Sequence, residues 1–77
     1  MTPARSQLAW RCRRGMRELD LLLLRWVEQR FDTAAAEERT LFARLLETPD
    51  PQLALWLFGA ERPAHEGLDR LVQGLRR

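Results

Sequence analysis

Apolar residues recur at intervals of three and four along most of the 77-residue chain, and no stretch alternates apolar and polar positions long enough to predict a half-buried strand. This spacing is typical of short amphipathic helices that share one core. It predicts an all-α single domain, a small five-helix bundle over residues 1–77 with its ordered core at about 6–75. The expected helices cover about residues 6–14 and 16–30, a segment after residues 31–33, a segment from 50 to 59, and a last segment that begins near residue 63.

Helix starts are indicated by residues that favour the N-cap position. Ser6 is expected to cap the first helix, and Asp32 or Thr33 the third. Asp50 is expected to cap the fourth helix, because Pro51 would then occupy the first helical position, where its missing N–H costs nothing. The sequence therefore predicts where each of these segments enters its helix.

The predicted core consists of the apolar stripes of these helices, including two tryptophans that we expect to be buried anchors. Its members are Leu19, Leu22, Leu23, Trp26, Val27, Leu41, Phe42, Leu45, Leu46, Leu53, Trp56, Leu57, Leu68, Leu71, Val72 and Leu75.

Charge is distributed unevenly along the chain. All thirteen basic residues are arginines, and residues 1–17 hold five of them with no acidic residue. The remainder carries eight arginines and eleven acidic residues, so its local charge is −3. A basic end on an acidic body favours binding to an acidic surface on a protein or a nucleic acid.

Several kinds of chemistry are excluded by residue counts. One cysteine, Cys12, rules out an internal disulfide, and with His65 as the one histidine no four-ligand His/Cys zinc site can form. The chain has no lysine and no tyrosine, so no nucleophile–base pair is indicated and we expect no catalytic residue. Cys12 is expected to be a half-buried spacer and His65 to be solvated. No apolar run is long enough to cross a membrane and no secretory signal is present, which predicts a cytoplasmic protein.

The segment "RGMRE" predicts a particular turn between the first two helices. Gly15 can adopt a backbone conformation that a side chain would disfavour and permits close approach of another surface. Glu18 would then be the third residue of the next helix, where its carboxylate can accept from the Gly15 N–H as half of a capping box. Arg14 can also pair with Glu18 at helical spacing.

The segments "CRRGMRELD" and "FARLLETPDPQLALWLFG" together resemble the FAD assembly factor family of bacteria, also called SdhE, which has a counterpart among mitochondrial succinate dehydrogenase assembly factors. The resemblance covers about residues 7–75. The hallmark of this family is an Arg-Gly-x-x-Glu motif, which Arg14, Gly15 and Glu18 match. Relatives often carry a basic residue where this chain has Gln7, a departure at the outer edge of the motif.

The resemblance implies a protein that binds the flavoprotein subunit of succinate dehydrogenase, and of fumarate reductase in bacteria that have one, and promotes covalent attachment of FAD. It implies that FAD stays on the flavoprotein, so no cofactor is expected to bind stably to this chain, and the chain alone is expected to be a monomer. The implied contact surface has Arg14, Gly15 and Glu18 at its centre, with Trp10, Arg11, Met16, Arg17 and Asp20 around them.

The expected mode of action is conformational. The chain would hold the flavoprotein so that FAD and the histidine that accepts it are aligned for reaction, without donating a catalytic group. Glu18 is expected to dock through hydrogen bonds rather than to act as a base.

Two alternatives remain at the level of sequence. Trp10 and the arginines beside it could stack on a base and neutralise phosphates of a nucleic acid, although the rest of the chain is acidic and the helix after Gly15 buries its leucines. The family has also been described as an antitoxin-like regulator, which would bind a different protein partner through the same kind of surface.

Overall fold

Five α-helices and one short 3₁₀ turn make up the protein in the computed structural model, which describes residues 4–76. They are α1 (Arg5–Arg11), α2 (Arg17–Gln29), the 3₁₀ turn η1 (Phe31–Thr33), α3 (Ala36–Leu45), α4 (Asp50–Leu57) and α5 (Glu66–Leu75). No strand occurs within this part of the chain. The predicted all-α, five-helix fold is confirmed.

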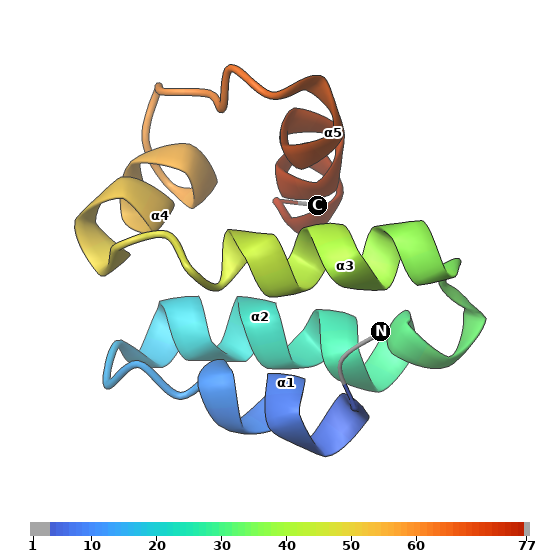
Figure 1. Cartoon of the computed structure of the whole chain (residues 1–77). Coiled ribbons are helices and arrows are strands. Elements are labelled where there is room, and N and C mark those ends of the chain that lie inside the picture. The colour runs from blue at the N-terminus through green and yellow to red at the C-terminus, as the bar shows by residue number, and fades with distance from the viewer. Residues whose placement is uncertain (1–3, 77) are drawn as a thin grey trace.

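The helices pack around one core. Figure 1 shows α3 crossing the view between the α1–α2 pair and the α4–α5 pair. At the centre, the Trp26 ring of α2 stacks on Phe42 of α3, with ring centroids 4.2 Å apart and planes 8° from parallel. Phe31 of η1 meets Trp26 edge to face, at 6.4 Å. Rigid aromatic rings thus join α2, η1 and α3.

The apolar stripes read from the sequence are the ones that the fold buries. Buried members of the predicted core are Leu19, Leu23, Trp26, Val27, Phe42, Leu45, Leu46, Leu53, Leu57, Leu68, Val72 and Leu75. Four others, Leu22, Leu41, Trp56 and Leu71, are partly buried and pack against them.

The predicted N-cap of the first helix is wrong. The N-cap is Ala4, two residues before the predicted Ser6, so that Ser6 lies inside the helix. The reason is that the Ala4 N–H donates to Gln7 Oε1 at 3.3 Å, which satisfies a backbone donor that the helix leaves without a partner.

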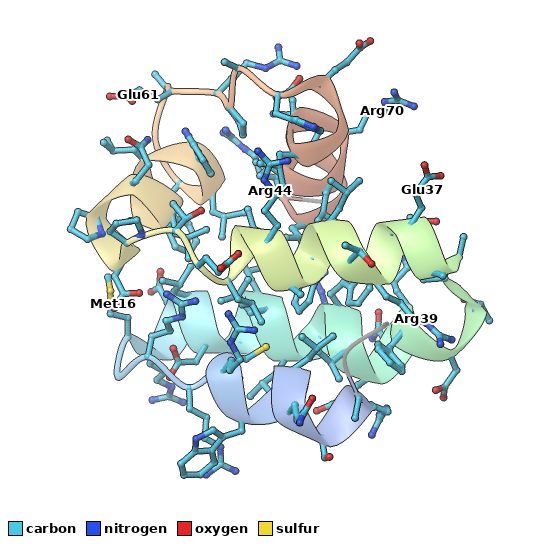
Figure 2. The ribbon with its side chains drawn as sticks, viewed as in Figure 1. Met16, Glu37, Arg39, Arg44, Glu61 and Arg70 are labelled. Carbon is cyan, nitrogen blue, oxygen red and sulfur yellow. The ribbon has the colours of Figure 1, made fainter. Side chains whose placement is uncertain are left out.

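The predicted caps of the third helix are wrong as well. Asp32 and Thr33 belong to η1, and α3 begins only after Ala35. An arginine of α3 fixes this turn, because Arg39 Nε donates to the Phe31 carbonyl oxygen at 2.9 Å and its guanidinium lies 4.2 Å above the Phe31 ring. Figure 2 labels Arg39 at this turn.

The fourth helix starts one residue before its predicted first position. Pro49 is the N-cap, Asp50 is the first helical residue and Pro51 the second. The Asp50 carboxylate is engaged elsewhere: it accepts from Arg14 at 2.8 Å. A long-range contact has therefore replaced the expected cap.

The fifth helix begins at Glu66, after the predicted start near Pro63, which is buried in the preceding loop. His65 is the N-cap, and its Nδ1 accepts from the Leu68 N–H at 3.2 Å. The prediction that His65 is solvated is confirmed, since the residue is exposed, and its ring also caps the start of α5.

Candidate functional site

The linker between α1 and α2 is closed by a carboxylate that reaches back from α2. Gly15 has φ +81°, the left-handed region in which side chains are strained, and a Cβ placed on it would meet nothing within 4 Å. Its N–H donates to Asp20 Oδ2 at 3.2 Å, and the N–H of the preceding Arg14 donates to Asp20 Oδ1 at 3.0 Å. One carboxylate therefore orders two successive peptide groups of the linker.

The prediction that Glu18 caps Gly15 is wrong. The N-cap of α2 is Met16, one residue later than expected, so Glu18 is the second residue of the helix rather than the third. Asp20, two residues further along, accepts the Gly15 N–H that the sequence assigned to Glu18, and it accepts the Arg14 N–H as well. Within residues 4–76, the exposed Glu18 carboxylate makes no hydrogen bond and no ion pair.

The guanidinium of Arg14 ties the linker to the connection between α3 and α4. Arg14 Nη1 donates to the Thr48 carbonyl oxygen at 3.1 Å and to Asp50 Oδ1 at 2.8 Å, and Nη2 donates to the Leu46 carbonyl oxygen. Its Nε donates to the Arg11 carbonyl oxygen at 3.1 Å, at the end of α1. The side chain is only 14% exposed. The predicted pairing of Arg14 with Glu18 is not formed, because Arg14 is held by these acceptors instead.

The other residues of the predicted contact surface face solvent. Trp10 is 71% exposed, and the Arg13 guanidinium lies 6.0 Å from the centroid of its ring. Figure 2 labels Met16 at the end of the molecule where α2 begins, in the view opposite Glu37 at the start of α3. The exposed members are Trp10, Arg11, Gly15, Met16, Arg17 and Glu18, whereas Arg14 and Asp20 are partly buried.

The structure thus separates the eight predicted residues into an exposed set and two residues, Arg14 and Asp20, that hold the linker in place. Sequence reasoning missed three parts of this site: the acceptor role of Asp20, the acceptors of Arg14 near Asp50, and the position of Arg13 beside Trp10. Only the last had a local signal, since residues three apart on a helix are neighbours.

Cys12, next to this site in sequence, is an inert core residue. It is fully buried, not half-buried as predicted. Burial raises the pKa of its thiol to about 12. The positive charges of Arg14 and Arg11 lower this pKa, and the negative charge of Asp20 raises it, but burial has the largest effect. Because the thiolate is the reactive form, Cys12 offers no nucleophile at neutral pH. Among residues 4–76 there is also no group of three or more metal-ligating side chains.

These features define a small helical protein with an exposed, arginine-rich corner built around a glycine in the left-handed conformation, here called the Gly15 corner (Trp10–Glu18). The family model described as the flavinator of succinate dehydrogenase, Sdh5, matches residues 6–77. The chain belongs to this family, and the resemblance inferred from its motifs is confirmed.

Named relatives agree with the family. The chain is 37% identical over 73 residues to an FAD assembly factor SdhE of Coxiella burnetii, covering 95% of this chain and 89% of the relative. It is 38% identical over 69 residues to an FAD assembly factor SdhE of Photorhabdus laumondii (90% and 78%) and over 68 residues to one of Serratia sp. (88% and 77%). Within residues 4–76, no helix is long and apolar enough to cross a membrane.

Proposed function

We propose that this chain binds the flavoprotein subunit of succinate dehydrogenase in the cytoplasm, and promotes covalent attachment of FAD to it. The observation that carries the proposal is the family membership, together with the name of the relatives, FAD assembly factor. The Gly15 corner supports it, because an exposed linker without side-chain cover at Gly15 lets a partner backbone approach closely. In bacteria that have fumarate reductase, the chain is proposed to bind the flavoprotein subunit of that enzyme too, because it is a flavoprotein of the same kind.

The chain acts in this proposal as a conformational clamp on its partner. Arg14 and Asp20 fix the linker before binding, so that little conformational entropy is lost when Gly15 and Glu18 meet the flavoprotein. FAD stays on the partner, since the Gly15 corner is an exposed linker and a flavin requires a deep cleft to bury its ring. Holding FAD and the acceptor histidine in a reactive alignment lowers the barrier without a group from this chain.

A pair of matched glutamates tests the docking surface. Glu18 and Glu37 are each the second residue of a helix and each exposed, at the starts of α2 and α3 respectively. Apo-flavoprotein is incubated with FAD and each variant, and covalent flavin is measured by in-gel fluorescence beside binding by calorimetry. We expect Glu18→Ala to lose binding and flavin attachment, Glu18→Gln to retain most of both, and Glu37→Ala to match the unmodified protein.

The result also decides the role of the carboxylate. If Glu18→Gln loses flavin attachment while it retains binding, the carboxylate takes part in the chemistry and the clamp mechanism is wrong. If the unmodified chain neither binds apo-flavoprotein nor raises its covalent flavin, the proposed function itself is wrong.

A further inference from the structure

The segment "TPDP" (residues 48–51) leads into α4 and lies far along the chain from the Arg-Gly-x-x-Glu motif. Figure 1 shows the connection from α3 to α4 at the same end of the molecule as the linker between α1 and α2. The guanidinium of Arg14 joins the two, through its bonds to Leu46, Thr48 and Asp50, across 32 to 36 residues of sequence. The fold therefore brings two distant sequence motifs together.

Asp50 is held in place by its own helix and does not cap it. The N-cap of α4 is Pro49, and no side chain supplies a capping hydrogen bond there. Leu53 and Leu57 of the same helix are buried in the core, so the first residue of α4 has a fixed place in the fold. The role left to the Asp50 carboxylate is its contact with Arg14, at 2.8 Å.

The other acceptors of the Arg14 guanidinium are neutral. They are carbonyl oxygens, whereas Asp50 is the carboxylate that forms a salt bridge with Arg14 in the described part of the chain. The Arg14 side chain is mostly buried, and removing one partner of such a pair leaves a charge without compensation. Without Asp50, the guanidinium is expected to turn towards solvent.

The Gly15 corner depends on such ties because Gly15 cannot fix its own conformation. Glycine has access to many backbone conformations, and no side chain packs at this position to select the observed φ of +81°. The linker is held on one side by Asp20, which accepts the N–H groups of Arg14 and Gly15, and on the other by Asp50 through the Arg14 side chain. Loss of Asp50 would remove one of these two ties.

We infer that Asp50 is a positioning residue for the docking surface: by holding Arg14, it keeps the Gly15 corner in the conformation that binds the flavoprotein. Asp50 acts through Arg14 and needs no contact with the partner. A linker that is ordered before binding loses less conformational entropy on association. This inference rests on the proposed function and adds to its machinery the start of α4, which lies outside the Gly15 corner.

The first test measures affinity for apo-flavoprotein by calorimetry, at a temperature where circular dichroism shows each variant to be folded. Asp50→Ala is expected to weaken binding by about tenfold, and Asp50→Asn by less, because asparagine retains the acceptor oxygen but not the charge. Phe42→Leu is the control, since it removes a core contact between α2 and α3 and leaves both ties of the linker in place. Its affinity is expected to stay within about twofold of the unmodified chain.

A double-mutant cycle tests whether Asp50 acts through Arg14. In a chain that already carries Arg14→Ala, the further change Asp50→Ala is expected to alter affinity by no more than about twofold, because the tie is already absent. If Asp50→Ala instead weakens binding by the same factor with and without Arg14, Asp50 contacts the flavoprotein itself and the inference is wrong.

A third measurement needs no partner. In ¹H–¹⁵N spectra of the free chain, the amide resonances of residues 13–17 are expected to shift or broaden in Asp50→Ala and to stay in place in Phe42→Leu. Unchanged resonances in Asp50→Ala would show that the corner keeps its conformation without this tie, which would overturn the inference.

The outcomes separate this inference from the proposed function. If the unmodified chain binds apo-flavoprotein and Asp50→Ala binds it equally well, Asp50 does not position the docking surface although the proposed function stands. If the unmodified chain does not bind, the proposed function is wrong and the inference falls with it.

Discussion

Replacing Arg14 by alanine is expected to lower the free energy of unfolding by about 3 kcal/mol. The side chain makes one charge-assisted bond to Asp50 and two bonds to the carbonyl oxygens of Leu46 and Thr48, across 32 to 36 residues of sequence. Hydrogen bonds to charged groups contribute about 1.5–3 kcal/mol each, and the sum is reduced because the three share one guanidinium. Asp50 would also keep its charge without its partner in a partly buried position.

This loss is large for a chain of 77 residues, whose total stability at ~0.05–0.15 kcal/mol per residue is about 4–12 kcal/mol. A domain of this size loses about 4–8 °C in melting temperature per kcal/mol, so Arg14→Ala is expected to melt ~12–24 °C lower. Urea denaturation followed by far-UV circular dichroism gives the free energy directly. The free energy of unfolding of Arg14→Lys is expected to lie between those of Arg14→Ala and the unmodified protein, because an ammonium group keeps the charge but cannot match the forked geometry of a guanidinium.

The matched control is Arg13→Ala. Arg13 is adjacent and carries the same charge, but it is exposed and lies beside an exposed tryptophan, so its loss is expected to cost no more than about 0.5 kcal/mol. If Arg14→Ala loses no more stability than Arg13→Ala, the contacts of Arg14 do not stabilise the fold and this prediction is refuted.

Three further predictions concern the core, the last helix and the buried thiol. Phe42→Leu is expected to cost about 1–2 kcal/mol in urea denaturation and to change the near-UV circular dichroism of Trp26, because the stacked ring is lost from a fully buried position; an unchanged aromatic signal would contradict the stack. His65→Ala is expected to cost about 1 kcal/mol and His65→Asn much less, since asparagine can also cap α5; equal losses in thermal denaturation would argue against the cap. Cys12 is expected to react with a thiol reagent at pH 8 only as fast as the protein unfolds, because burial raises its pKa to about 12. For the same reason the unfolded chain, with a thiol pKa near 9.0, loses this proton first, so stability is expected to fall as pH rises from about 9 towards 12, and Cys12→Ala should lack this component; rapid native-state labelling would contradict both expectations.

The fold could be predicted because its main determinant is local. The spacing of apolar residues within each helix selects the buried face, and Leu19, Leu23 and Val27 are buried as their spacing predicts. Helix ends were predicted less well, because they depend on contacts from outside the helix. Arg39 of α3 fixes the turn that displaced the expected caps, and Asp50 was drawn from capping by Arg14.

The candidate site could be located from the sequence, but the hydrogen bonds within it could not be predicted. The motif spacing indicated Gly15 as the turn, and its φ of +81° confirms that position. Which carboxylate closes the turn depends on a shift of one residue in the start of α2, which exchanges the roles of Glu18 and Asp20. The partners of Arg14 lie more than thirty residues away, and no local pattern encodes such a distance.

The contacts of Arg14 also determine when the Gly15 corner is formed. Its shape depends on Thr48 and Asp50, which enter the chain long after the motif has been made. A nascent or partly unfolded chain would contain every residue of the motif and still lack the surface that these residues form in the folded protein. In a chain that is still being synthesised, the Gly15 corner is therefore completed only once residue 50 is present, and a substitution of Asp50 would alter it through Arg14.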